Sequence, residues 1–275
     1  MGDAMKLGKA LRRLALPCAI TASLVSPAAA ESLHAQYAVS MIGLHIGELS
    51  ADGTLEPQNY RVQIGAHLTG LAAMVSSVHM ALASSGTVRK DKLAPSTYAT
   101  SAVNSNETRT LRMALKAGTV KAVQIDPPPE FHGERVPVTE ANKRNILDPT
   151  SALIMPVPVS AALVGPSACD RTLPIYDGYA RFDIALHYVG QRDVSVAGYN
   201  GPVSVCSARY MPISGHLVNS RSTAFMAQNE GIEVWLAPVE KAHVVVPIRV
   251  TMPTMAGQLD IEATDFEVTG AEATH

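Results

Sequence analysis

Few side chains in this sequence have the types and spacing that chemistry requires. Asp183 and His187 are the best pair for moving a proton, because a carboxylate can orient and charge an imidazole. They lie four residues apart in an alternating run, and on a strand that spacing separates two side chains by about 13 Å. We therefore interpret them as members of a polar row on one face of a strand.

The usual catalytic and cofactor signatures do not occur in the sequence. It has no HExxH, CxxC, GxSxG, Walker or GxGxxG motif, and its nine histidines are dispersed. We expect no catalytic residue, no metal ligands and no cofactor, and hence a protein that is not an enzyme. A hydrolase with a dispersed active site is an alternative that turnover of ester and glycoside substrates would reveal.

Two of the three cysteines, Cys169 and Cys206, are candidates for a structural disulfide. They are the only cysteines after residue 30. Closing a loop of this size stabilises a fold by roughly 4 kcal/mol in the loop-entropy model. We predict that they are bonded, and the alternative is a pair of buried thiols. Cys18 follows Pro17, where lipid attachment would need a small residue, so we interpret it as an ordinary apolar residue.

Residues 1–30 have the three parts of a signal peptide. Four basic residues precede a short apolar run at 14–25, and the alanines at 28–30 supply a cleavage site before Glu31. The run is too short to cross a bilayer. We expect a periplasmic location, and an oxidising compartment agrees with a disulfide.

The charge of the remaining chain excludes several classes of protein. Residues 1–30 account for four of the 22 basic and one of the 24 acidic residues, so the rest has a net charge of −5. That balance argues against a nucleic acid partner. Aromatic residues make up 5% of the chain, too few for the two girdles of an outer-membrane barrel, and we expect no transmembrane segment.

Residues 31–275 have the pattern of a single β-rich domain. Apolar and polar residues alternate in short runs between turn signals, which predicts about ten to twelve antiparallel strands with one or two short helices. Residues 179–188 and 203–210 are expected to be two strands joined by a long loop. An irregular excursion at 126–158 begins with three prolines and contains a short helix starting at Asp148-Pro149.

Five short motifs follow one another along the chain. They are Tyr37…Gly43-Leu44…Gly47-Glu48, Asp148-Pro149-Thr150-Ser151-Ala152, Cys169…Tyr176-Asp177-Gly178…Arg181-Phe182-Asp183, Gly198-Tyr199…Cys206…Tyr210…Gly215-His216 and Glu233-Val234-Trp235-Leu236. In this order they resemble a family of secreted proteobacterial proteins, the domain of unknown function numbered 3108. The resemblance covers nearly all of the chain after residue 30. It implies no activity, and it implies a single strongly curved antiparallel sheet, an open barrel or β-spiral similar to periplasmic lipoprotein carriers and envelope-integrity proteins.

Some expected strands carry apolar residues on both faces, as in 37–46 and 244–252. One face can pack in a core, but the other must be covered, because large exposed apolar patches are unusual on soluble proteins. We therefore expect a cavity for a lipid or another apolar ligand. Its candidate lining residues are Tyr37, Ile46, Phe182, Trp235 and Val245, and plain packing is the alternative for Trp235.

These observations predict a non-enzymatic periplasmic protein of the cell envelope that binds a lipid-like ligand or supports envelope integrity. The alternative is a structural scaffold whose partner is another envelope protein. Co-purified lipid would separate the two.

Overall fold

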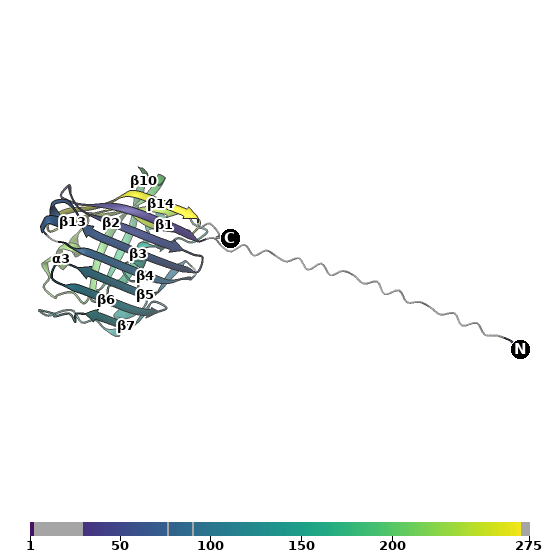
Figure 1. Ribbon diagram of the computed structural model, residues 1–275, viewed down its shortest axis with the longest axis horizontal. Coiled ribbons are helices and arrows are strands. Elements are labelled where there is room, and N and C mark those ends of the chain that lie inside the picture. The colour runs from purple at the N-terminus through teal and green to yellow at the C-terminus, as the bar shows by residue number, and fades with distance from the viewer. Residues whose placement is uncertain (3–29, 76, 90, 271–275) are drawn as a thin grey trace.

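The computed structural model describes residues 1–2, 30–75, 77–89 and 91–270, so residues 3–29 of the predicted signal peptide, Cys18 among them, lie outside the described residues. The chain forms one antiparallel sheet of 14 strands (Figure 1). The order is β7-β6-β5-β4-β3-β2-β1-β14-β13-β12-β11-β10-β9, with β8 paired to β13. The strands are β1 (Glu31–Met41), β2 (Leu44–Leu55), β3 (Asn59–Leu68), β4 (His79–Arg89), β5 (Lys92–Val103), β6 (Thr108–Lys116), β7 (Thr119–Asp126), β8 (Met155–Pro156), β9 (Arg171–Tyr176), β10 (Arg181–Val196), β11 (Tyr199–Ser214), β12 (Ile232–Val239), β13 (Val244–Thr254) and β14 (Gly257–Gly270).

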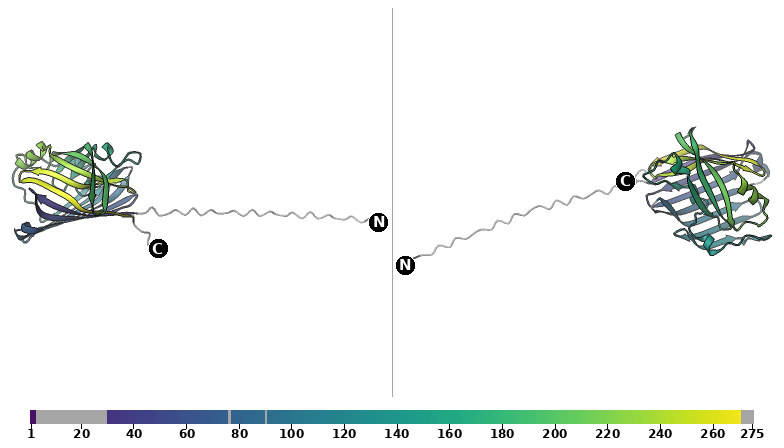
Figure 2. Two further views of the ribbon diagram at one scale, coloured as in Figure 1. Left: turned by 90° about the horizontal axis from the view of Figure 1, so that it is seen from above. Right: turned by 180° about the vertical axis from the view of Figure 1, so that it is seen from behind.

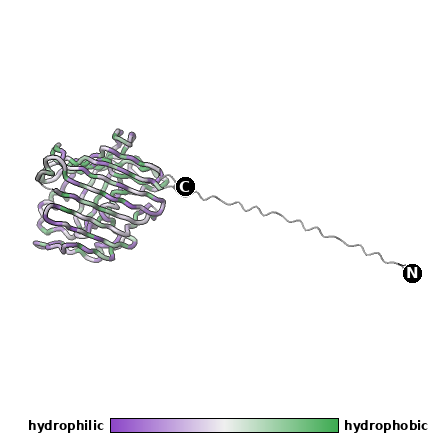
Figure 3. Tube along the Cα trace, viewed as in Figure 1, coloured by the Kyte–Doolittle hydropathy of each residue, from purple (hydrophilic) through white to green (hydrophobic). Residues whose placement is uncertain are grey.

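Alternation of apolar and polar residues accounts for most of these strands. In β3, Tyr60, Val62 and Ile64 are buried while Arg61 and Gln63 are exposed, as expected for a sheet with one covered face. Figure 3 shows the same alternation of hydrophilic and hydrophobic positions along neighbouring strands. The prediction of a mostly β, antiparallel fold agrees with this architecture.

The strand count and the central hairpin differ from the expectation. There are 14 strands rather than ten to twelve. β10 and β11 are 16 residues each and follow one another across a two-residue turn, so the long loop expected between them is strand. Residues 191–193 in this hairpin are all exposed and polar, so no alternation marked them as a strand.

The sheet is neither closed nor strongly curled, in contrast to the curvature that the resemblance implied. Its edge strands β7 and β9 do not pair with each other in the described part of the chain. The free edge of β9 is instead hydrogen-bonded by Leu147, whose backbone N–H donates to Pro174 and whose carbonyl accepts from Tyr176. The irregular segment thus takes the place that a closing strand would need.

That irregular segment is longer than the predicted 126–158 and runs from 127 to 170. It contains two short 3-10 helices, η1 (Glu140–Lys143) and η2 (Ser151–Leu153), the short strand β8, and α2 (Pro166–Cys169). The helix predicted after Asp148 is the 3-10 turn η2, because Pro156 leaves too little room for a longer helix. Two further helices lie outside the segment, α1 (Gly70–Val75) and α3 (Arg221–Gln228), and α3 begins at the N-cap Ser220.

The two halves of the sheet form two layers. Figure 2 shows strands from the C-terminal half lying over one face of the N-terminal half. The largest apolar cluster combines buried side chains of β1–β3 with those of β11–β14 and with Ile154 of the irregular segment. The turn between β10 and β11 reaches back to β14, where the Phe266 N–H donates to the Ala197 carbonyl at 2.8 Å.

Candidate functional site

An apolar cavity of about 120 Å³ lies between the two layers. Strands β1, β2, β3, β13 and β14 supply its walls, and Leu153 and Ile154 of the irregular segment close one side. On β2 and β3 the apolar lining residues are every second residue, because side chains alternate between the two faces of a strand. The lining residues are Leu33, Tyr37, Leu49, Ala51, Asp52, Gly53, Leu55, Val62, Ile64, Leu153, Ile154, Val246, Pro247, Val250 and Ile261.

The polar groups of the lining are already satisfied or point away. The Tyr37 hydroxyl donates to the Pro247 carbonyl at 2.8 Å within the protein, and burial raises the pKa of Tyr37, so it stays neutral. The Asp52 carboxylate is 2.7 Å from His34 Nδ1 and its side chain is 61% exposed, on the outer face. The interior therefore presents no charge and suits an apolar group.

A second cleft of about 240 Å³ adjoins this cavity at the end of the sheet where β1 begins. Leu55 and Ile154 line both spaces and form the wall between them. The cleft also carries the polar side chains of Glu31, Lys241 and His243. An apolar interior next to a polar opening is the arrangement that an amphiphilic molecule requires.

A buried polar network fixes the irregular segment against the N-terminal layer. One Asp148 oxygen accepts hydrogen bonds from the Ser84 hydroxyl at 2.8 Å and the Ser151 N–H at 2.9 Å, and the other accepts from the Ser151 hydroxyl at 2.6 Å. The Tyr60 and Ser151 hydroxyls are 2.7 Å apart. Burial raises the pKa of Asp148, and the hydrogen bonds partly oppose this shift. All four side chains are buried, so the network lies inside the fold.

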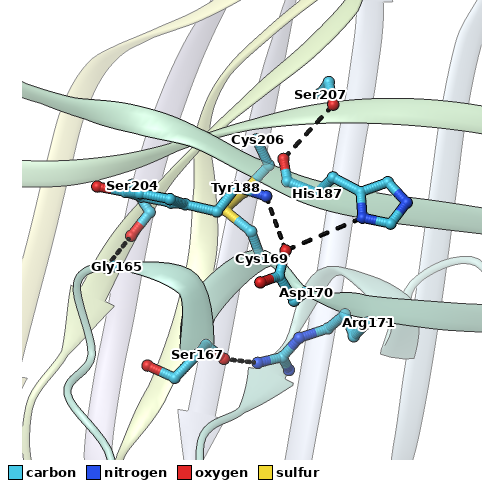
Figure 4. Close-up of a disulfide and its surroundings, with 10 residues drawn as sticks. All are labelled: Gly165, Ser167, Cys169, Asp170, Arg171, His187, Tyr188, Ser204, Cys206 and Ser207. Atoms are coloured by element: carbon cyan, nitrogen blue, oxygen red, sulfur yellow. Dashed lines mark hydrogen bonds and ion pairs between the residues drawn. A yellow bond between two sulfur atoms is a disulfide. The ribbon is translucent and has the colours of Figure 1, made fainter.

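The Cys169–Cys206 disulfide is present and joins α2 to β11 (Figure 4). Its Cα atoms are 5.5 Å apart and both cysteines are fully buried in a second apolar cluster. Hydrogen bonds flank it, from the Gly165 N–H to the Ser204 hydroxyl at 2.9 Å and from the Tyr188 N–H to Asp170 at 2.9 Å. The bond therefore anchors the end of the irregular segment to the C-terminal layer.

The structure separates the five predicted lining residues. Tyr37 lines the cavity. Ile46 lies beside the start of α1, where its carbonyl accepts from the Thr69 N–H. The Phe182 ring packs 5.3 Å from Tyr210.

Trp235 and Val245 also lie away from the cavity. The Trp235 ring packs under the Arg249 guanidinium, 4.9 Å from it, and its indole N–H donates to Glu233 at 2.6 Å. Val245 is fully buried in the cluster around the disulfide. A residue that is out of phase with the cavity-facing row on β13 must point to the opposite face.

Asp183 and His187 do not form a pair. Asp183 is 2.5 Å from Arg181, and the His187 Nδ1 lies 4.0 Å from Asp170. Asp177 accepts backbone hydrogen bonds from Tyr179 and Ala180 at 2.8 and 2.7 Å, which is the turn role that Asp-Gly predicts.

Most cavity residues were not recognised from the sequence. Val62, Ile64, Val246 and Val250 belong to alternating apolar rows, so the signal for a covered face was present. Which rows face one another depends on the pairing of β1 with β14, whose partners are more than 200 residues apart. Local periodicity carries no information on that pairing.

Two kinds of feature are absent from the described part of the chain. Within it, no three His, Cys, Asp or Glu side chains are grouped so as to hold a metal ion. No helix among the described residues is long and apolar enough to cross a membrane.

Comparison with known proteins gives a family and a distant structural likeness. None of the curated proteins matches the chain. A solved structure described as a beta-barrel-like protein of domain of unknown function DUF1849, from Brucella abortus, is similar with a TM-score of 0.46 and 9% identity, over 88% of this chain and 98% of that one. The model of the family described as "Protein of unknown function (DUF3108)" matches residues 36–264. That match spans most of the sequence, and the chain therefore belongs to the DUF3108 family.

Proposed function

We propose that this protein is a non-enzymatic component of the bacterial cell envelope, exported to the periplasm, that binds an apolar or lipid-like ligand between its two layers. The cavity lined by apolar side chains of β1–β3, β13 and β14 is the observation that carries the proposal. A polar cleft behind Leu55 and Ile154 would hold the head of an amphiphile whose apolar end occupies the cavity.

The cavity volume limits what can enter. Cavities of about 150 Å³ accept a molecule as small as benzene, whereas pockets for larger ligands measure about 300–1,000 Å³. At about 120 Å³ the cavity admits the end of an acyl chain. A longer chain would have to displace the side chains of Leu55 and Ile154 and continue into the cleft.

The surroundings of two aspartates whose pKa is raised support a non-enzymatic role. Asp148 and Asp177 both have a pKa raised by burial, which is a common property of catalytic acids. Both already accept hydrogen bonds from neighbouring residues of their own segments. Their environment fits the fixing of turns in a fold.

A scaffold role in an envelope complex is the second candidate. The observation that favours it is the small volume of the cavity compared with ordinary ligand pockets. In that case the apolar interior would be a packing defect between the layers, and binding would occur at the surface.

Ligand binding is tested with protein recovered after export. Native mass spectrometry would identify a bound molecule, and intact mass would show whether the chain begins at Glu31. The delipidated protein is then titrated with dansyl-undecanoic acid. Saturable binding supports the proposal, whereas no bound lipid and no saturable site would leave the scaffold role.

A matched pair of variants locates the binding. Ala51 lines the cavity, so Ala51→Phe would fill it and weaken probe binding at least about tenfold. Ala114 is exposed on β6, and Ala114→Phe adds the same ring outside the cavity. Equal affinity in the two variants would place the probe elsewhere, and melting temperatures of both would show that each is folded.

A further inference from the structure

The end of the sheet opposite the chain termini carries unusual turns. Ile42 and Gly43 join β1 to β2, and the side chains of Ile42 and Leu44 are 67% and 69% exposed. The neighbouring turn, between β13 and β14, carries Met255, which is 57% exposed. The two turns are in contact, since the Ile42 N–H donates to the Gln258 carbonyl at 2.8 Å.

Ile42 adopts a backbone conformation that its side chain disfavours. Its φ is +53° and that of Gly43 is +75°, as in a type I′ turn. Asn-Gly is the favoured pair in this turn, because a β-branched residue rarely adopts positive φ. Asparagine would also suit solvent better than an exposed isoleucine. A residue that is unfavourable on both grounds points to a role for the apolar side chain itself.

The two turns carry no charged residue. Residues 40–47 and 252–259, which form the two turns and the adjoining strand ends, contain no Asp, Glu, Lys or Arg. Helix α1, which also contains no charged residue, lies alongside them, since the Thr69 N–H donates to the Ile46 carbonyl at 3.0 Å.

Turns at the opposite end of the sheet are charged. Glu56 lies between β2 and β3, Asp91 between β4 and β5, and Glu240 and Lys241 between β12 and β13. The termini of the sheet, Glu31 and Gly270, lie at this charged end (Figure 1). The two turns with Ile42 and Met255 differ from these turns in carrying no charge.

We infer that these two turns contact the surface of a lipid bilayer, with Ile42, Leu44 and Met255 inserted among the lipid head groups. These side chains protrude from turns. A protein partner would need a matching hollow, whereas a lipid surface deforms around protruding groups. The absence of charge lowers the cost of leaving water. Attraction by the apolar groups alone should be insensitive to salt.

The inference is tested by flotation of the exported, processed protein with vesicles of phosphatidylethanolamine and phosphatidylglycerol. The protein should float with the vesicles at both low and high salt. The double variant Ile42→Asn/Leu44→Thr should bind at least about tenfold more weakly. Asn-Gly suits this turn, so Ile42→Asn alone should not lower the melting temperature.

Val189→Asn is the matched control, because Val189 is 57% exposed on β10 and lines neither the cavity nor the cleft. It should float like the unaltered protein. The inference fails if the protein does not float, if the double variant floats equally well, or if high salt abolishes binding. It also fails if size-exclusion chromatography shows that the turns join two copies of the chain.

The vesicle and probe measurements separate this inference from the proposed function. The double variant should keep its affinity for dansyl-undecanoic acid, and Ala51→Phe should keep its affinity for vesicles. If the protein floats but binds no probe, the membrane contact stands and the ligand-binding proposal does not. If the protein binds the probe but does not float, the membrane contact is refuted and the ligand-binding proposal stands.

Discussion

The Ser84 hydroxyl donates a hydrogen bond of 2.8 Å to the Asp148 carboxylate and joins β4 to the irregular segment, 64 residues further along the chain. Asp148 also accepts from the backbone N–H groups of Thr150 and Ser151. One carboxylate therefore shapes the turn η2 and docks it on the N-terminal layer. The cavity residues Leu153 and Ile154 follow immediately, so this contact also sets one wall of the cavity.

Asp148→Ala should destabilise the fold strongly. It leaves the buried backbone N–H groups of Thr150 and Ser151 without this acceptor, at a cost of about 3 kcal/mol or more. Asp148→Asn keeps an acceptor oxygen and should cost about 1 kcal/mol. Urea unfolding measures both, with Asp193→Ala, at an exposed residue of β10, as the control. Equal losses for the Ala and Asn variants would show that the hydrogen bonds contribute little.

The same carboxylate should make stability depend on pH. Burial raises the pKa of Asp148 above its ordinary value of 3.8, so the folded state holds a proton that the unfolded state releases. The free energy of unfolding should therefore fall as pH rises from 3.8 through the raised pKa, and should level off above it. Burial also raises the pKa of Asp177. The contribution of Asp148 must therefore be measured as a difference in stability between the unaltered protein and a variant.

Asp148→Asn removes this titration and leaves that of Asp177. Its stability relative to the unaltered protein should therefore improve as pH rises above 3.8. Unfolding at a series of pH values measures the difference. A difference between the two proteins that is constant across the series would contradict the assigned shift.

Gly215 occupies a position where no side chain fits. Its φ is +84°, and a Cβ there would lie 2.1 Å from the Tyr179 carbonyl oxygen. Gly215→Ala should destabilise the protein by about 2 kcal/mol or more. In Gly190→Ala, by contrast, the new methyl group meets no atom within 4 Å, and the change should be neutral or slightly stabilising. Thermal unfolding compares the two, and similar melting temperatures would contradict the assigned contact.

How well a feature of this protein could be predicted from the sequence depends on how far apart in the chain its interacting residues lie. Tyr60, Val62 and Ile64 alternate with polar residues, so their strand and its buried face follow from neighbouring residues alone. The disulfide followed from the cysteine count and the expected compartment, without any knowledge of distance. Asp177-Gly178 predicted a turn because its hydrogen bonds are local.

The cavity depends on contacts that are distant in the sequence. Val246 lies opposite residues of β1–β3 only because β14 pairs with β1. Phe182 and Trp235 are large and apolar, but their own strands direct them toward Tyr210 and Arg249. The closing turn at Leu153 and Ile154 is irregular, and no periodic pattern marks it. Size and hydrophobicity alone therefore did not identify the lining.

The Cys169–Cys206 disulfide should contribute a large part of the stability. It closes a loop with a sequence separation of 37 residues between two fully buried positions, which corresponds to roughly 4 kcal/mol in the loop-entropy model. Cys169→Ser and Cys206→Ser should each lower the melting temperature and increase cleavage by proteases. The double variant should resemble the single variants, because either change alone breaks the bond.

Thiol labelling separates the bond from simple packing of two cysteines. The exported protein, unfolded without reductant, should incorporate no label, and prior reduction should expose two thiols. Reduction should also lower the melting temperature of the unaltered protein while leaving that of the double variant unchanged, since the variant has no bond to lose. Two labelled thiols per chain before reduction would refute the disulfide, and the stability of the variants would then reflect the loss of buried sulfur atoms alone.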